Sequence, residues 1–235
     1  MPQFTLYANI IATAPDRVQL AINEAGFTDY ERIEVDMGTQ EHKTPEYLAR
    51  NPFGKVPTLV TSDGITMYES RGIARYLCTR YNFDLLPDPK DNAAVALFEQ
   101  EISCEAAYFE RPVSSIAYES SIKPILGMET NQENLEEGKK LLGQYFDTAE
   151  AIFNKTGKKF WAGDKYTLVD VYYIPHLARI FERGYGDLVT SRPALNAWWQ
   201  RCLARPASKA FIENVPKLEE VLAHIQKVKA AKEAK

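Results

Sequence analysis

Hydrophobic and polar residues change their spacing several times within the first eighty residues of the chain. Residues 3–7 form a short apolar stretch, and residues 30–37 alternate apolar with polar side chains, which indicates two strands. Between them, residues 13–26 repeat apolar side chains every three to four positions and end at Gly26, a common helix stop. This part of the chain therefore predicts a strand, a helix and a second strand.

The following segments add a hairpin and another helix. Residues 57–68 contain two short apolar runs joined through Asp63 and Gly64, a dipeptide that favours a tight hairpin turn. Residues 69–81 return to helical spacing. A βαβ unit followed by an antiparallel hairpin and a covering helix predicts a compact α/β domain with a mixed sheet over residues 1–82.

The pattern breaks after this domain. Residues 83–92 contain two prolines and three aspartates without helical or strand periodicity, so they predict a linker. Beyond it strand signals end, and the amphipathic helices predicted are 93–120, 133–155, 167–184 and 194–206. Pro112 is expected to bend the first of these helices. Residues 93–235 are therefore predicted to form an all-helical second domain.

Composition narrows the classes of function. Lys and Arg total 28 against 32 Asp and Glu, so no basic surplus exists to neutralise the phosphates of a nucleic acid. The three cysteines, Cys78, Cys104 and Cys202, lie far apart, which is typical neither of a disulfide framework nor of a metal site, and fits a reducing compartment. No basic leader precedes the apolar N-terminal segment, and no run is apolar enough to span a bilayer. A cytoplasmic globular protein without a nucleic-acid or membrane partner is expected.

Residues 51–60, NPFGKVPTLV, contain a conflict. The apolar run suits a buried strand, but Pro57 stands where the strand should begin and can donate no N–H to a sheet. Pro57 therefore either marks a sheet edge or turns the backbone of Val56 toward something outside the sheet.

The same residues carry a family resemblance. The segment NPFGKVPTL, followed by GITMYESRGIARYL, resembles the glutathione transferase superfamily, and EHKTPEYLARNPFGKVP is similar to its phi class, found in plants and fungi. FWAGDKYTLVDVYYIPHL, at residues 160–177, matches the helical domain of that family, so the resemblance covers essentially the whole chain.

The resemblance implies a fold and an activity. The fold is a thioredoxin-like, glutathione-binding first domain followed by an all-helical domain that contributes the electrophile pocket. The activity is conjugation of glutathione to small hydrophobic electrophiles, a detoxification reaction, with reduction of peroxides by glutathione as an additional one. Glutathione is the cosubstrate, no cofactor or metal is implied, and a cytoplasmic homodimer is expected.

The resemblance also implies how glutathione is held. In this family the bond before the proline at position 57 is cis, which turns the N–H and C=O of Val56 toward the cysteinyl backbone of glutathione. Ser70 is implied to hold the γ-glutamyl carboxylate at a helix N-terminus, and Glu69 the α-amino group. The alternative is that Glu69 and Ser70 only cap this helix.

A second group of residues corresponds to contacts with the other end of glutathione. His42 and Lys43 fall where phi-class members contact the glycyl carboxylate. Lys55 occupies a place usually held by glutamine, a departure in charge that still allows it to reach this carboxylate. Taken without the resemblance, a His-Lys pair in a loop is usually exposed to solvent.

The residue that would stabilise the glutathione thiolate is missing from its usual place. Phi-like members use a serine shortly after the first strand, and an ungapped comparison with LYANIIATAPDRV puts Ala12 there. Thr13 is the next hydroxyl, and it either caps the following helix or donates to the thiolate. A third alternative is that the amides and dipole of this helix stabilise the sulfur directly. Tyr7 should face the opposite side of the strand, so it does not replace the missing serine. Weak conjugation is therefore expected.

The apolar substrate needs a pocket beside the thiolate. Ile11 from the first domain and Tyr108, Phe109 and Pro112 from the long helix are the candidates for this electrophile pocket. The alternative is that the aromatic stripe belongs to the helical core.

Three further residues are assigned to folding and assembly. Thr167 and Asp170, in the segment TLVD, resemble the capping box of the family's helical core and predict the start of a helix. Phe53 corresponds to an aromatic that inserts into the neighbouring subunit in related transferases, which predicts a homodimer.

Two other functions compete with the transferase. A ligandin-type carrier would bind glutathione and apolar ligands with weak catalysis, and the alanine at position 12 favours it. The second competing function is that of an interaction module attached to a translation factor or regulator. The lack of an appended region argues against it. A glutathione-dependent thiol transferase is disfavoured because no cysteine occupies the turn after the first strand.

Overall fold

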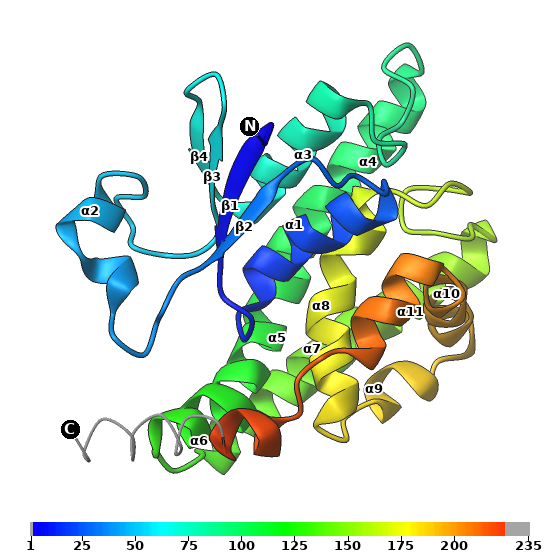
Figure 1. Cartoon of the computed structure of the whole chain (residues 1–235). Helices are drawn as coiled ribbons and strands as arrows, with labels where there is room; N and C mark the ends of the chain where they lie inside the picture. Colours follow the sequence, from blue (N-terminus) through cyan, green and yellow to red (C-terminus); the bar gives the residue numbers. More distant parts are fainter. Residues whose placement is uncertain (1, 224–235) are drawn as a thin grey trace.

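The computed structural model describes residues 2–223, so the end of the predicted second domain lies outside the described residues. Figure 1 shows a small sheet at one side of the molecule, with most of the helices gathered at the other. The strands, in the spatial order β2-β1-β3-β4, are β1 (Phe4–Ala8), β2 (Glu31–Glu34), β3 (Thr58–Thr61) and β4 (Thr66–Tyr68). β1 runs parallel to β2 and antiparallel to β3, so the predicted mixed sheet is confirmed.

One face of the sheet is packed against two helices. Phe4, Leu6 and Ala8 alternate along β1 and are buried in one cluster with residues of α1 (Thr13–Glu24) and α3 (Ser70–Tyr81). Burial of each large apolar side chain contributes roughly 2 kcal/mol, which accounts for the two helices lying on this face.

The remaining helices form the second part of the chain. They are α4 (Asn92–Cys104), α5 (Glu110–Ala117), α6 (Lys123–Leu126), α7 (Gln132–Thr156), α8 (Leu168–Glu182), α9 (Asp187–Thr190), α10 (Pro193–Leu203) and α11 (Pro206–Glu213). The expected architecture, a small mixed α/β part followed by an all-helical part, is confirmed. Among residues 2–223, no helix has the length and apolar character needed to cross a membrane.

The long helix predicted at 93–120 is interrupted before its proline. A π-helical segment, η2 (Glu105–Phe109), separates α4 from α5, and a second one, η3 (Tyr118–Ile122), follows α5. Pro112 lies in the first turn of α5, where its ring would clash with the carbonyl four residues earlier in a regular helix. The wider turn of η2 just before it relieves this clash.

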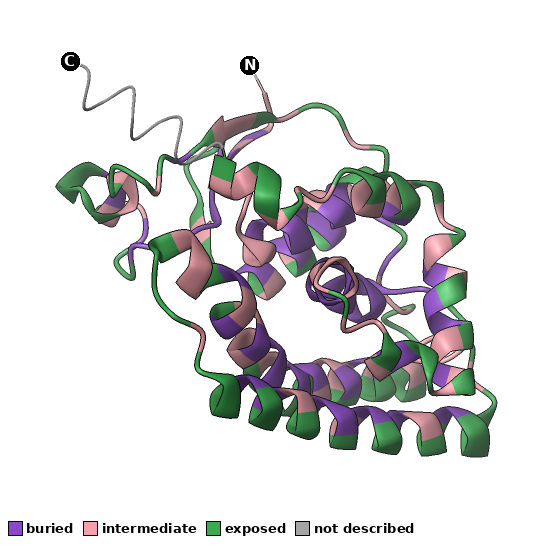
Figure 2. Cartoon of the chain, turned by 90° about the horizontal axis from the view of Figure 1, so that it is seen from below, coloured by how far each residue is buried: buried purple, intermediate pink, exposed green. Residues whose placement is uncertain are grey.

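Helix α8 runs through the centre of the helical part. Most of its residues are buried, and Figure 2 shows the buried positions concentrated on the inward faces of the surrounding helices. Its start has the predicted capping box: the Asp170 carboxylate accepts the Thr167 N–H at 2.8 Å. The same carboxylate also accepts the Trp161 N–H and the Trp198 indole N–H, so it joins three segments of the core.

Candidate functional site

Three segments far apart in the sequence converge at one end of the sheet. In the β1–β3 register Thr58 lies opposite Tyr7, so Val56 and Pro57 adjoin the turn between β1 and α1. In the β3–β4 register Thr58 lies opposite Tyr68, so the start of α3 adjoins Pro57 on its other side. The candidate site is built from these three segments.

The Val56–Pro57 peptide bond is cis, as predicted. Val56 precedes β3, and among the described residues no hydrogen bond involves its amide or its carbonyl. Neighbouring groups fix the segment: the carbonyl of Lys55 accepts the Asn51 side-chain amide at 2.7 Å and the Tyr47 hydroxyl at 2.9 Å. Because buried backbone groups are almost always paired, a free donor and acceptor side by side favour an extended ligand here.

The start of α3 faces the same point. Glu69 precedes the helix with φ +72°, a left-handed conformation uncommon for a residue other than glycine and concentrated at functional sites. Ser70 is the first helical residue and is buried, and its hydroxyl makes no hydrogen bond within residues 2–223. A free hydroxyl with the unpaired amides of a helix N-terminus can bind a carboxylate.

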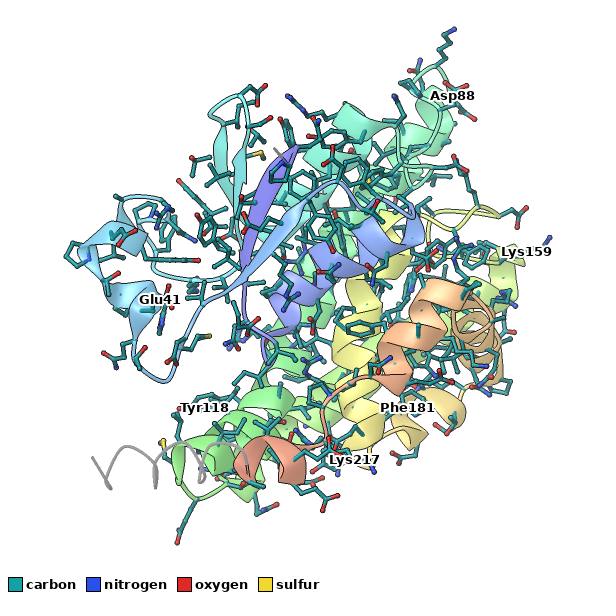
Figure 3. The ribbon with its side chains drawn as sticks, in the orientation of Figure 1. Glu41, Asp88, Tyr118, Lys159, Phe181 and Lys217 are labelled. Atoms are coloured by element: carbon teal, nitrogen blue, oxygen red, sulfur yellow. The ribbon has the colours of Figure 1, made fainter. Side chains whose placement is uncertain are left out.

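A short helical segment borders the site on the outer side of the sheet. It consists of η1 (Glu41–Lys43) and α2 (Pro45–Leu48), and Figure 3 marks it by Glu41, on the side away from the helical part. The Lys43 ammonium donates to the carbonyl of Gly54 at 2.8 Å, which ties this segment to the loop before Pro57. Gly54 has φ +54°, and a Cβ there would lie 2.7 Å from the His42 carbonyl, so only glycine allows this close approach.

The two other predicted contacts in this region differ in their surroundings. His42 Nδ1 is buried and has no partner among the described residues, and burial together with the charge of Lys43 lowers the pKa of His42. Lys55 is exposed, directly beside Val56. The chain therefore presents positive or hydrogen-bonding groups at this side of the site.

The turn between β1 and α1 is shaped by Asn9. Its side-chain amide donates to the Val35 carbonyl at 3.0 Å, and its side-chain oxygen accepts the Ile11 amide at 3.1 Å. Its backbone carbonyl accepts the Ala12 amide. Asn9 is thus a turn former that holds the start of α1 beside Val56.

Of the two roles left open for Thr13, capping of α1 is not observed. The N-cap residue is Ala12, and Thr13 is already the first helical residue, where its side chain cannot reach the amides of its own first turn in the capping geometry. The Thr13 hydroxyl instead lies 3.2 Å from His176 Nε2 on α8. The hydroxyl that the sequence left with two roles is therefore free of the capping role.

Behind Thr13 lies a buried cluster of charges between the sheet and the helical part. Arg71 on α3 forms a bidentate pair with Glu105, at 2.7 and 2.8 Å, and also contacts Glu110. Arg17 on α1 contacts Glu110 and donates to the Tyr172 carbonyl. Two arginines thus balance two glutamates, as buried charges require.

Sequence reasoning missed this cluster and His176. The available signal was weak: Arg17 precedes Val18 on the apolar face of a predicted helix, and Glu105 interrupts an amphipathic one. Helical spacing alone cannot tell which charged residue faces another element, so only the packing of α1, α3 and α5 reveals the cluster.

The four residues predicted for the electrophile pocket do not come together. Phe109 is fully buried among Tyr145, Phe146 and Tyr173, so its assignment to the pocket is wrong and it belongs to the core. Ile11 lies in the β1–α1 turn, is partly exposed, and does not contribute to the depression lined by Tyr108 and Pro112.

Tyr108 and Pro112 line a different depression. It has a volume of about 480 Å³, lies between the α4–α5 region and α7, and is also lined by Leu141 and Ile152. All of its lining residues fall between residues 100 and 161, so it is separate from the β1–α1 turn.

The cysteines carry no sign of reactivity. Cys78 is buried on α3, and burial raises the pKa of its thiol to about 12. A thiol with so high a pKa is not ionised near neutral pH, and Cys78 is part of the apolar core.

Two family models match the chain. Residues 14–80 match the model described as glutathione S-transferase, N-terminal domain, and residues 98–206 match the one described as glutathione S-transferase, C-terminal domain.

The similar proteins include plant glutathione S-transferases. A glutathione S-transferase of Arabidopsis thaliana is 37% identical over 217 residues, covering 88% of this chain and 98% of the relative. A glutathione S-transferase of Nicotiana tabacum is 32% identical, covering 90% and 98%.

Solved structures similar to this chain are also glutathione transferases. A glutathione transferase of Populus trichocarpa superposes with a TM-score of 0.84 at 28% identity, covering 91% of this chain and 99% of that one. A maize glutathione S-transferase in complex with an atrazine–glutathione conjugate gives a TM-score of 0.82 at 30% identity, covering 90% and 97%.

Proposed function

This chain belongs to the phi class of the glutathione S-transferase family, and from that membership we propose that glutathione binds where Val56, Ser70 and Thr13 converge. The enzyme is a transferase that conjugates glutathione to hydrophobic electrophiles and uses glutathione as cosubstrate without a cofactor. The comparisons favour this activity over the ligandin-type carrier.

The observation that carries the proposed site is the free backbone of Val56 beside the cis Pro57 bond. Its N–H and C=O pair with the cysteinyl residue of glutathione in the manner of an added strand. This fixes the middle of the tripeptide and places its sulfur next to the start of α1.

The two ends of glutathione are then held by two different sets of residues. The Ser70 hydroxyl and the first amides of α3 bind the γ-glutamyl carboxylate, while the exposed Glu69 carboxylate binds the α-amino group. His42, Lys43 and Lys55 lie on the side of the glycyl carboxylate. Lys43 acts chiefly through its contact with Gly54, because its ammonium is engaged there.

Thr13 is the proposed catalytic residue. Its hydroxyl donates to the thiolate, assisted by the amides and the dipole at the start of α1. Lowering a thiol pKa by two units requires about 2.7 kcal/mol of additional stabilisation of the anion. The hydroxyl and the helix start together supply it in place of the serine that Ala12 replaces.

Calorimetry with reduced glutathione tests the site. Ser70→Ala should raise the dissociation constant about tenfold, because a hydrogen bond to a charged carboxylate contributes about 1.5 kcal/mol. Ser62→Ala, in the exposed hairpin, is the matched control and should leave the constant unchanged. A wild-type protein that gives no binding heat at millimolar glutathione would refute the proposal.

The proposed assembly is a homodimer. Phe53 is 61% exposed, unusual for a phenylalanine, and lies on the loop before Pro57. The depression lined by Tyr108, Leu141 and Ile152 is apolar and large enough for a phenyl ring, so we assign it as the receptor for Phe53 of a second copy. Two further proposals concern location and substrate. The cysteine pattern alone supports a cytoplasmic location. Ile11, in the turn before α1, is the proposed contact to the electrophile.

A further inference from the structure

We propose that His176 is a positioning residue for catalysis: it holds the oxygen of Thr13 and leaves the hydroxyl hydrogen of Thr13 directed at the glutathione sulfur. This inference rests on the proposed site and assigns a role in it to a residue of the second domain.

A continuous chain of contacts leads from the charge cluster to Thr13. The Arg17 guanidinium lies 3.1 Å from His176 Nδ1, and His176 Nε2 lies 3.2 Å from the Thr13 hydroxyl oxygen. Arg17 and His176 are both almost completely buried, so water does not compete for these contacts. Each ring nitrogen therefore has one protein partner.

The partner of Nδ1 decides the tautomer. A guanidinium has only donors, so the contact with Arg17 requires Nδ1 to accept. A neutral imidazole with an accepting Nδ1 carries its hydrogen on Nε2. His176 therefore donates through Nε2 to Thr13.

The surroundings keep the ring neutral. Arg17 on α1, Arg71 on α3 and Arg179 on α8 oppose a positive charge on His176, and Glu110 on α5 favours one. Burial and the arginines prevail and lower the pKa of His176 to about 3. Near neutral pH the ring holds a single hydrogen, the one on Nε2.

The orientation of Thr13 follows from this donor. Since the Thr13 oxygen accepts from His176, its own hydrogen must point elsewhere, and within residues 2–223 the hydroxyl has no other partner. A threonine inside a helix commonly donates to the carbonyl four residues earlier. Thr13 is the first residue of α1, so no earlier turn of the helix supplies such a carbonyl. The thiolate beside the helix start is the acceptor left for the Thr13 hydrogen.

Titration of the thiolate absorbance of bound glutathione tests the proposal. His176→Phe fills the ring volume without a donor, and should raise the thiol pKa by about one unit and lower the turnover near neutral pH about tenfold. The loss should disappear at alkaline pH, while the glutathione dissociation constant stays within about twofold. His176→Gln places an amide N–H near Nε2 and should retain most of the activity.

The Thr13→Val background separates positioning from a general structural effect. If His176 acts through Thr13, adding His176→Phe to Thr13→Val should not raise the thiol pKa further. An equal increase in both backgrounds, or no increase in either, would overturn the proposal. If the wild-type protein does not bind glutathione, the proposed function itself is contradicted, so the two failures are distinguishable.

A measurement on the wild-type protein covers the case in which His176→Phe does not fold. The nitrogen chemical shifts of a histidine distinguish the two neutral tautomers, and the His176 signal is identified by its loss in His176→Gln. A hydrogen on Nε2 is expected over the whole neutral range. A hydrogen on Nδ1, or a charged ring, would overturn the proposal.

Discussion

At the scale of single residues, the proposed site depends on two small side chains at the start of α1, those of Ala12 and Thr13. Ala12 cannot supply a hydroxyl, and Thr13, one residue on, makes a contact across to α8 that a cap could not make. The sequence indicated both residues, but it left Thr13 between two roles because a helix start is predicted only to within a few residues. The contact with His176 depends on residues 163 positions apart, which no local pattern encodes.

The buried histidine gives stability a specific pH dependence. The folded pKa of His176, about 3, lies below its ordinary value of 6.5, so between these values the unfolded chain binds more protons. The free energy of unfolding therefore falls as the pH is lowered through this window. In His176→Gln, urea titrations should show a loss between pH 7 and pH 4.5 that is smaller than in the wild type by about 2–3 kcal/mol.

The difference between the losses of unfolding free energy in the two proteins provides its own control. Other groups that titrate in the window are the same in both proteins, so their contributions cancel in the difference. Identical losses in the two proteins would mean that His176 is already charged, or already exposed, in the folded state.

At the scale of helices and strands, periodicity predicted most of the fold. The four strands, α1, α3 and the long helices were all indicated, since each buries one regular face. The short helices α2, α6, α9 and α11 were not, because so few turns give no periodic signal. The π-helical segment η2 was missed for a different reason: its spacing is set by the clash at Pro112 and by the packing of Glu105, not by a repeat.

The start of α8 offers a test of how an element is held. Asp170→Ala leaves the buried donors of Thr167, Trp161 and Trp198 without an acceptor, and should lower the free energy of unfolding by about 3 kcal/mol or more. Asp91→Ala removes an exposed N-cap from α4 and should cost only about 1 kcal/mol. Denaturant unfolding of both variants makes the comparison, and equal costs would show that the Asp170 contacts add nothing beyond a cap.

At the scale of the whole molecule, the fold class and the function were predicted from the sequence more completely than the pockets were. Motifs around Pro57 and α3 identified the family because they are local, and a glutathione transferase fold followed from them. The pocket assignment failed at Phe109 because a helix has several faces, and only packing determines which of them meets the core. The charge cluster, which joins α1 and α3 to the helical part, also became visible only after folding.

Assembly is the property to test at this scale. Phe53→Ala should weaken the proposed dimer by about 2–3 kcal/mol, a fall in affinity of roughly two orders of magnitude, because it removes the ring assigned to the depression between the α4–α5 region and α7. Sedimentation at graded concentrations measures the effect. Leu126→Ala, which removes an equally exposed side chain from α6, should sediment as the wild type does.

The free main chain at Val56 has a consequence for how this protein can vary. A ligand recognised through amide and carbonyl groups does not sense which side chain stands at that position. Random replacement there can disturb local fit, but only a second proline would delete the donor. In the proposed site, main-chain groups that side-chain mutations leave almost unchanged therefore bind the centre of the tripeptide. The neighbouring side chains can still vary and so accommodate different electrophiles.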